Sequence, residues 1–239
     1  MLFVIGTPIG NLADITLRAL EALKSADVIA AEDTRHSGIL LRHFEIRKPM
    51  VSYHEHNEAM RTAELSERLA AGANVALITD AGMPGLSDPG ARLIRACIER
   101  GLDYTVIPGA SAILTALVGS GFSLERFSYR GFLPPKSGGR ERELRAAAER
   151  EETTVFFESP HKINKTLAAC VEIMPGRQLC VARELTKKFE EFCRGTAAEL
   201  LAHYEARPAK GEITLVVAAE NDKATKVGCL SNRSEPPDH

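Results

Sequence analysis

Short apolar runs alternate with helical patterns through the first half of the chain, and this alternation constrains the fold more than any other feature. Most of these runs are apolar throughout, and they cover residues 2–5, 28–31, 50–53, 75–79 and 104–107. Continuously apolar strands are typical of a parallel sheet that helices cover on both faces. The sequence therefore predicts an N-terminal α/β domain over residues 1–120 with a mainly parallel sheet.

Helix start signals lie between the predicted strands. Asp14 can cap a helix over residues 15–25, and Asn57 can cap one over 58–71. Pro89 suits the first turn of a helix over 90–100.

The pattern changes in the second half of the chain. Residues 119–139 are rich in turn formers, and strands are then expected at 154–157, 179–183, 188–194 and 212–219, with helices at 140–150, 161–174 and 197–205. The short turn between 179–183 and 188–194 indicates antiparallel pairing. We therefore expect a second α/β domain over 121–220 with a mixed sheet and a cleft between the two lobes. The polar residues 221–239 lack periodicity, and we expect a disordered tail or a cloning remnant there.

Composition excludes several classes of protein. The chain is 44% hydrophobic and 26% charged, and no apolar run approaches the ~20 residues of a membrane span. The N-terminus has no basic segment typical of a signal peptide. Five cysteines form no C-x-x-C pair, which favours a cytoplasmic protein with reduced cysteines and no zinc knuckle. Residues 125–145 carry six basic and three acidic side chains, so this excess of +3 fits either phosphate contact or an ordinary solvated surface.

The first loop, GTPIGN at residues 6–11, resembles the start of a nucleotide-binding unit without matching one. It has neither the G-x-G-x-x-G spacing of a dinucleotide site nor the G-K-[ST] ending of a Walker loop. Glu32 and Asp33 follow the second strand, where a Rossmann protein holds a ribose. NAD binding and a plain strand-to-helix turn therefore both remain open for this loop.

Three further loops at predicted strand ends share its polar, turn-rich composition: residues 31–35, 79–90 and 107–112. Ligands of parallel α/β sheets bind beyond the carboxyl ends of the strands. Asp80 could accept hydrogen bonds from ribose hydroxyls or from an amine, while Ser111 fits a helix N-cap equally well. The four loops together predict a nucleotide-like ligand.

Eight segments then carry a resemblance over nearly the whole chain, to about residue 219. They are GTPIGNL, AEDTRHSG, YHEHNE, TDAGMPGLSDPG, PGASA, FESPHK, ARELTK and KGEIT, in this order. Together they resemble the small-subunit ribosomal RNA methyltransferases of the tetrapyrrole methylase superfamily. The resemblance implies a two-lobed fold that binds S-adenosylmethionine in the cleft between the lobes. It also implies a homodimer that methylates the ribose 2′-hydroxyl of a cytidine in the decoding region of 16S rRNA.

The resemblance also implies which residues bind the cofactor. The methionine end and the adenosine should contact Pro8, Asp80, Met83, Ser111 and Ala112, with second-lobe contacts from Phe157, Ala182, Glu212 and Ile213. Met83 stands where the family frequently has threonine, which should alter local packing more than chemistry. Family members often carry a helical extension after the last strand, where this sequence has the polar residues 221–239.

Methyl transfer to a hydroxyl needs a group that takes its proton. Glu32, Asp33 and Glu184 are the leading candidates for this base, and His54, His56 and Lys210 are further ones. His54 and His56 would share one face of a strand, but no third ligand is evident and we expect no metal. As substrate contacts we expect the two histidines and four cations: Arg35, Lys162, Arg183 and Lys187. Glu158 and His161 fit a structural cap as well as a site.

Two other functions remain open at this point. A tetrapyrrole C-methyltransferase of the same superfamily would act on a large anionic macrocycle, and a non-catalytic RNA-binding or ribosome-assembly factor would use the cofactor only structurally. The segments AEDTR and YHEHNE favour the RNA branch.

Overall fold

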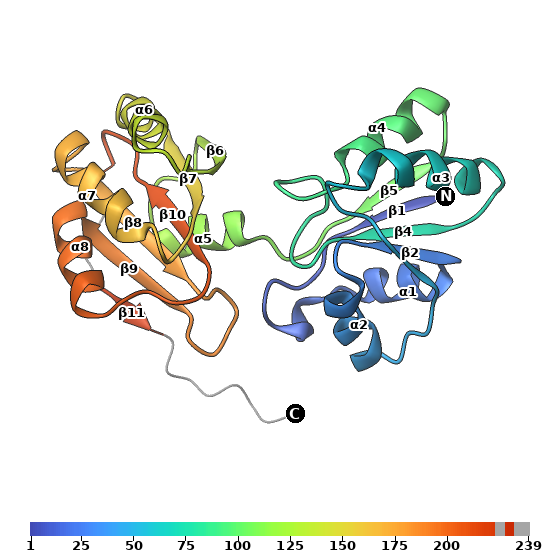
Figure 1. Ribbon diagram of the computed structural model, residues 1–239. Coiled ribbons are helices and arrows are strands. Elements are labelled where there is room, and N and C mark those ends of the chain that lie inside the picture. Colours follow the sequence, from blue (N-terminus) through green and yellow to red (C-terminus); the bar gives the residue numbers. More distant parts are fainter. Residues whose placement is uncertain (223–227, 232–239) are drawn as a thin grey trace. The chain divides into compact units, whose positions relative to one another are not determined.

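The computed structural model describes residues 1–222 and 228–231. The chain forms two compact units that divide after Ser111, and Figure 1 colours them blue to green and green to red. Helix α5 (Ala112–Ser120) packs on strands of the second unit, so the division precedes the boundary expected at residue 120.

The sheet of the first unit is wholly parallel, as predicted. Its strands are β1 (Leu2–Ile5), β2 (Val28–Ala31), β3 (Met50–Ser52), β4 (Val75–Ile78) and β5 (Tyr104–Ile107), in the order β3-β2-β4-β1-β5. Every carboxyl end therefore lies at one edge of the sheet. The inner strands β2 and β4 are buried throughout, but full burial was wrong for β3 and β5, because an edge strand is covered incompletely.

Helices cover both faces of this sheet (Figure 1). Helices α1 (Leu17–Ser25) and α2 (Thr34–His43) bury Leu23 and Leu41 against one face. Helices α3 (Glu58–Ala70) and α4 (Ala91–Arg100) bury Leu65 and Leu93 against the other. Two hydrophobic layers thus hold the sheet that carries the site loops.

Helix starts differ from the sequence prediction at three points. Helix α1 is capped by Thr16, whose hydroxyl accepts a bond from the Ala19 N–H at 3.1 Å, whereas Asp14 ends a short 3-10 turn. Asn57 precedes α3, but its side chain turns back to His54 and caps nothing. Helix α2, capped by Asp33, was not predicted.

The second unit holds a mixed sheet. Its strands are β6 (Phe127–Phe132), β7 (Thr153–Glu158), β8 (Gln178–Arg183), β9 (Glu191–Thr196), β10 (Ile213–Val217) and β11 (Leu230–Ser231), in the order β11-β9-β8-β10-β7-β6. Only the β6–β7 pair is parallel among these described strands, and the predicted antiparallel pairing of β8 with β9 is confirmed. Strand β6 was missed because glycines and prolines surround it in the stretch expected to be turns.

Three helices pack on one face of this sheet. Helices α6 (Ser137–Ala148), α7 (Ile163–Ile173) and α8 (Ala197–Ala206) bury Leu144, Leu167 and Leu200 in one cluster with Phe156. Glu158 is buried and accepts bonds from the Ser159 N–H at 2.7 Å and the Thr166 hydroxyl at 2.5 Å. This carboxylate therefore holds the start of α7.

The cysteines correct one expectation. Cys193 in β9 and Cys229 before β11 form a disulfide, so these two are not reduced in the structure. Cys97, Cys170 and Cys180 are free and buried, and burial raises the pKa of Cys170 and of Cys180 to about 12. Strand β11 lies within the expected disordered tail, whereas residues 223–227 and 232–239 of that tail lie outside the described residues.

Within residues 1–222 and 228–231, no helix is long and apolar enough to cross a membrane.

Candidate functional site

Four loops leave the carboxyl edge of the first unit's sheet, and backbone bonds join three of them. The Gly6 N–H donates to the Ile107 carbonyl at 3.0 Å, while Thr7 and Gly82 exchange two backbone bonds of 2.9 and 3.2 Å. A Cβ at Gly109 would lie 2.5 Å from the Gly6 carbonyl oxygen. The opening GTPIGN loop therefore depends on glycine for backbone-to-backbone contact.

Carboxylates gather where β2 and β4 end side by side. The Asp33 N–H donates to Asp80 Oδ1 at 3.1 Å, and the Asp80 N–H approaches Glu32 Oε2 at 3.5 Å. Asp33 accepts bonds from the Arg35 N–H at 2.8 Å and from its guanidinium at 3.1 Å. We call Glu32, Asp33 and Asp80 the acidic cluster.

The cluster's surroundings give Glu32 and Asp33 different proton affinities. Burial raises the pKa of Glu32 above its ordinary value of 4.5, and the negative charges of Asp80 and Asp33 raise it further. The Asp80 N–H and His54 act in the opposite direction, but the pKa stays raised overall. Hydrogen bonds from Arg35 lower the pKa of Asp33. Glu32 is therefore the better proton acceptor of the two.

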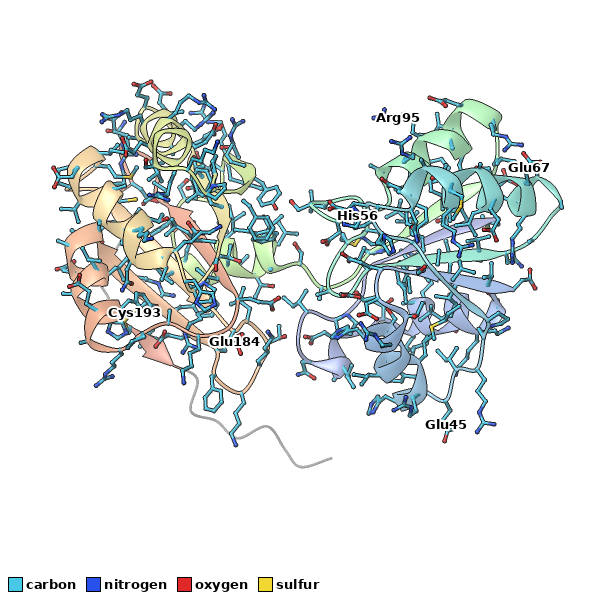
Figure 2. All side chains as sticks on the ribbon, in the orientation of Figure 1. Glu45, His56, Glu67, Arg95, Glu184 and Cys193 are labelled. Atoms are coloured by element: carbon cyan, nitrogen blue, oxygen red, sulfur yellow. A yellow bond between two sulfur atoms is a disulfide. The ribbon has the colours of Figure 1, made fainter. Side chains whose placement is uncertain are left out.

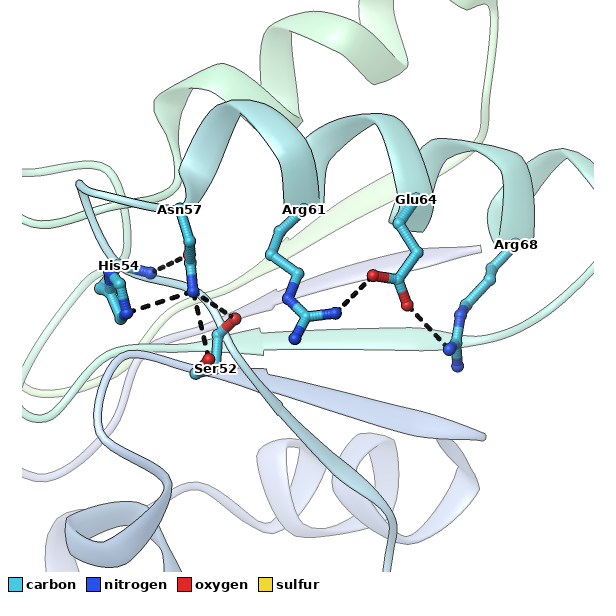
Figure 3. Close-up of polar contacts among 6 residues, drawn as sticks. All are labelled: Ser52, His54, Asn57, Arg61, Glu64 and Arg68. Atoms are coloured by element: carbon cyan, nitrogen blue, oxygen red, sulfur yellow. Dashed lines mark hydrogen bonds and ion pairs between the residues drawn. The ribbon is translucent and has the colours of Figure 1, made fainter.

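His54 lies beside this cluster in an unexpected conformation. Figure 3 shows Asn57 donating to His54 Nε2 at 3.1 Å and to the Ser52 carbonyl at 3.2 Å. Strand β3 ends at Ser52, and the Asn57 N–H donates to the His54 carbonyl at 3.0 Å, which closes a turn. The prediction that His54 and His56 share a strand face was therefore wrong. The His56 side chain is 83% exposed beside Glu55.

The remaining predicted cofactor residues of the first unit follow the same loops. Pro8 is buried, and the Met83 sulfur packs over Gly6. Ser111 ends the first unit and Ala112 begins α5, both partly exposed.

Sequence reasoning missed a hydroxyl at the end of β4. Thr79 is 2% exposed, and its Oγ1 has no hydrogen-bond partner within the described residues. Its carbonyl accepts a bond from the Thr7 hydroxyl at 3.1 Å. A threonine directly after a buried apolar run is the signal that could have found it.

A groove of about 1070 Å³ runs along α3 and α4 of the same unit. It reaches Glu32 and His54, and Figure 2 labels His56 and Arg95 of its lining. Five carboxylates line it against three arginines: Glu32, Glu55, Glu58, Asp88, Glu99 and Arg92, Arg95, Arg100. Its charge balance does not favour a phosphate.

Three of the predicted site residues of the second unit, Glu184, Lys187 and Glu212, form an internal network, and Figure 2 labels Glu184. Glu184 Oε1 accepts from Lys187 Nζ at 3.0 Å and from the Glu212 N–H at 3.1 Å, and Lys187 also donates to Glu212 Oε2 at 2.7 Å. Burial by itself raises the pKa of Glu184, but the Glu212 N–H and the Lys187 ammonium outweigh it, and the pKa is lowered overall. Glu184 is thus a poor proton acceptor.

The other predicted cations are also engaged in part. Arg183 donates to Glu191 Oε2 at 3.1 Å and to the Lys210 carbonyl at 3.1 Å, and its side chain is 17% exposed. Arg35 is 91% exposed, although Asp33 lies 3.1 Å away. Lys162 is half-buried just before α7. Arg35 and Lys162 therefore remain better placed for a phosphate than Arg183.

The sheet register sorts the predicted second-unit cofactor residues by face. Phe157 pairs with Thr214, and Thr214 pairs with Ala182, so all three side chains share one face. Ile213 lies in the cluster beneath the helices on the opposite face. The structure thus places Phe157 and Ala182 on one face of the sheet, where Phe157 is partly exposed and Ala182 is buried, and turns Ile213 to the other face.

One group of described residues has the composition of a metal site. The ligand atoms of Cys193, His203 and Cys229 lie within 4.8 Å of one another. The disulfide, however, uses both sulfur atoms and leaves one imidazole. The expectation of no metal stays a prediction.

Comparison with known proteins assigns this architecture to a family and a fold. Residues 1–201 match the family Tetrapyrrole (Corrin/Porphyrin) Methylases. Three solved structures share the fold, and each comparison covers 91% of this chain. The methyltransferase CobJ has a TM-score of 0.67 and 21% identity over 93% of its chain, and diphthine synthase has a TM-score of 0.70 and 18% identity over 89% of its chain. A uroporphyrin-III-C-methyltransferase from Thermus thermophilus has a TM-score of 0.64 and 22% identity over 93% of its chain.

Sequence relatives narrow the assignment. The chain is 47% identical to a protein of Synechocystis sp. over 91% of this chain and 78% of the relative. It is 44% identical to one of Bacillus subtilis over 93% and 76%, and 42% identical to one of Thermotoga maritima over 92% and 98%. All three are named ribosomal RNA small subunit methyltransferase I. The chain therefore belongs to the tetrapyrrole methylases and, within them, to the family of ribosomal RNA small subunit methyltransferases I.

Proposed function

We propose that this protein transfers a methyl group from S-adenosylmethionine to the ribose 2′-hydroxyl of a cytidine in the decoding region of 16S rRNA. The family supplies the reaction class. The acidic cluster at the carboxyl edge of the first unit's sheet is the observation that carries the proposal for this chain.

The acidic cluster fits a cationic methyl donor. S-adenosylmethionine, when bound, supplies a methyl group on a positively charged sulfur, which is electrophilic without a metal. The carboxylates of Glu32 and Asp80 can stabilise positive charge, and the buried Thr79 hydroxyl still has a hydrogen bond to make. Pro8, Met83 and Ser111 complete the proposed cofactor set in this unit, and Ala112 follows Ser111 as the first residue of the second unit.

In the second unit, Phe157, Ala182, Glu212 and Ile213 complete the same proposed set. Phe157, which is partly exposed, can meet a ligand through its side chain, whereas the fully buried Ala182 can contribute only through its backbone. The buried Ile213 and the ion-paired Glu212 can contribute only through the backbone or the rim.

Glu32 is the residue we assign as general base. A base must hold the proton of the 2′-hydroxyl, and a raised pKa makes a carboxylate better at this. The other two candidates already have stabilising partners, since Arg35 lowers the pKa of Asp33 and the Glu212–Lys187 network lowers that of Glu184. The reaction rate should therefore increase with pH through the raised pKa of Glu32.

The exposed Arg35 and the half-buried Lys162 lead the proposed substrate contacts. Arg35 and Lys162 fit phosphate contacts, because such bonds position an RNA chain without reading its sequence. His54 and His56 would lie near the ribose, next to Glu32 on the same groove. Arg183 and Lys187 can reach a phosphate only by leaving their carboxylate partners.

A methyl-transfer assay tests the proposal. Labelled S-adenosylmethionine would be offered with small ribosomal subunits from a strain lacking the modification, with naked 16S rRNA and with a precorrin. Label in 2′-O-methylcytidine is expected from one of the RNA substrates. Label in the precorrin alone would overturn the proposal in favour of tetrapyrrole methylation, and cofactor binding without any transfer would favour a non-catalytic RNA-binding factor.

We further propose that the protein acts as a cytoplasmic homodimer on 16S rRNA within the small subunit. Light scattering of the purified chain measures its mass against the 26.0 kDa of one copy. A mass of a single copy at all concentrations would contradict the dimer.

A further inference from the structure

Three aromatic side chains gather at the β6 end of the second unit's sheet. The Phe157 ring lies 5.1 Å from that of Tyr129 and 5.3 Å from that of Phe132, both in edge-to-face geometry. Phe132 is nevertheless 64% exposed. We call Tyr129, Phe132 and Phe157 the aromatic platform.

A β-bulge creates this platform. Tyr129 pairs with Val155 and Phe132 pairs with Phe157, so two residues on β6 oppose one on β7. Gly131 within the bulge has a φ of +70°, a value that favours glycine. Without the extra residue, the alternation of side chains would turn Phe132 to the opposite face. The bulge thus directs a large apolar ring outward beside Phe157.

The platform lies on the face opposite α6, α7 and α8. Phe156, the neighbour of Phe157, is buried in the cluster beneath those helices, so Phe157 points the other way. Helix α5 packs on β8, β9 and β10 of the second unit's sheet. The aromatic platform occupies the β6–β7 end of that sheet, where Phe132 remains open to a flat ligand.

Positive side chains flank the platform along the chain. Arg126 precedes the platform residues of β6 in the sequence, Arg130 lies between Tyr129 and Phe132, and Lys136 follows them. All three cations are exposed. Arg126 lies 3.9 Å from Glu151, and Arg130 lies 3.3 Å from Glu143 of helix α6, so the Arg130 side chain extends toward the helix-covered face and away from the rings. No acidic residue among the described ones forms an ion pair with Lys136. An exposed aromatic ring with a lysine nearby in the chain is a combination found in sites that bind single-stranded nucleic acid.

We infer that the aromatic platform stacks an unpaired base of the RNA substrate. This inference rests on the proposed function. The same rings could stack the adenine of the methyl donor, since any nucleobase offers the same flat surface, but the exposed Lys136, which forms no ion pair among the described residues, favours a polyanion over a sulfonium compound.

The test variant is Phe132→Ala, with Phe132→Trp as the conservative exchange. Phe132 is so exposed that its removal should leave folding intact, which a thermal melt checks. Phe189→Ala is the matched control, because Phe189 is 66% exposed on the same unit. Each protein would be titrated with a single-stranded RNA 12-mer, with the corresponding duplex and with S-adenosylmethionine.

Phe132→Ala should weaken binding of the single-stranded RNA about tenfold or more, leaving duplex binding and cofactor affinity within twofold. Phe132→Trp should restore the affinity. Wild-type affinity of Phe132→Ala for the single-stranded RNA would overturn the inference that the aromatic platform binds RNA. Equal losses of this affinity in Phe132→Ala and Phe189→Ala would overturn it as well. A loss of cofactor affinity alone would assign the rings to adenine and overturn the RNA assignment. Failure of wild-type protein to methylate any RNA would instead refute the proposed function.

Discussion

The two units use their charged residues in opposite ways. In the first unit, Glu32 and Asp80 lie at the ends of parallel strands and contact mainly backbone N–H groups. In the second unit, Lys187 pairs with Glu184 of its own turn and with Glu212, which precedes β10. Both sets belong to motifs that resemble the family, yet only the first leaves charge available to a ligand. A motif that resembles the family therefore indicates where a residue lies in the fold, and the chemical role of that residue has to be inferred from its contacts.

The largest expected effect of a single substitution on this comparison is that of Glu32→Gln on activity. Glu32→Gln removes the proposed base, and we expect kcat to fall about 10²- to 10⁴-fold, a larger loss than any accompanying loss of cofactor affinity. In the wild type, the rate should rise with pH through the raised pKa of Glu32, and this rise should vanish in the variant. Single-turnover assays across pH measure both.

Glu21→Gln, an exposed exchange on α1, serves as the control for Glu32→Gln. Unchanged kcat in Glu32→Gln, with its pH profile intact, would remove Glu32 from the mechanism and return Asp33 or Glu184 to consideration.

Gly109→Ala tests whether the loops of the first unit depend on backbone contact. The added Cβ would meet the Gly6 carbonyl oxygen at 2.5 Å, and we expect a loss of about 3 kcal/mol in the free energy of unfolding. Gly138→Ala is the matched control, because its Cβ meets nothing within 4 Å on helix α6, where alanine is favoured. Urea denaturation followed by circular dichroism compares the two, and equal stabilities would refute the close-packing argument.

Asp80→Ala tests the acidic cluster as the cofactor's electrostatic partner. Removing one carboxylate and the acceptor of the Asp33 N–H should raise the dissociation constant for S-adenosylmethionine about 10- to 100-fold. Calorimetric titration measures this beside Glu21→Ala, which makes the same change in net charge. An unchanged dissociation constant would separate the cluster from the cofactor.

Glu184→Gln should have the smallest effect. The carboxylate stabilises a turn in which Glu184 and Thr186 have φ of 52° and 65°, and its loss should cost about 1 kcal/mol of unfolding free energy at pH 7. Because folding lowers the pKa of Glu184, this stabilisation is present above about pH 4.5 and disappears as the pH falls through the lowered value. Urea titrations at pH 7 and at acidic pH measure the difference, and a constant difference across pH would contradict the ionic origin.

Sequence patterns predicted the parallel sheet of the first unit well, because buried strands such as Val28–Ala31 and Val75–Ile78 are apolar at every position. They also predicted that the site loops lie at one edge of the sheet, since parallel strands align their carboxyl ends. Strand β6 escaped prediction because its bulge breaks the alternation on which strand recognition depends.

The site was harder to predict than the fold. The sequence presents Glu32, Asp33 and Glu184 as equivalent carboxylates. Arg35, two residues along the chain, lowers the pKa of Asp33, whereas burial raises that of Glu32, and the distant Glu212 N–H together with Lys187 outweighs burial and lowers that of Glu184. His54 and His56 were placed on a strand that in fact ends at Ser52. Burial, pairing and register are properties of contacts between distant segments, so no local pattern contains them.

The position of β1 determines when the first unit can be completed. This strand is synthesised before β4 and β5, yet it lies between them, so both of its edges are paired only after Ile107 has been made. At translation speeds of about 5 to 20 residues per second, about 5 to 20 s pass before the edge that faces β5 is paired. The apolar residues of β1 are consequently exposed to aggregation during most of the unit's synthesis.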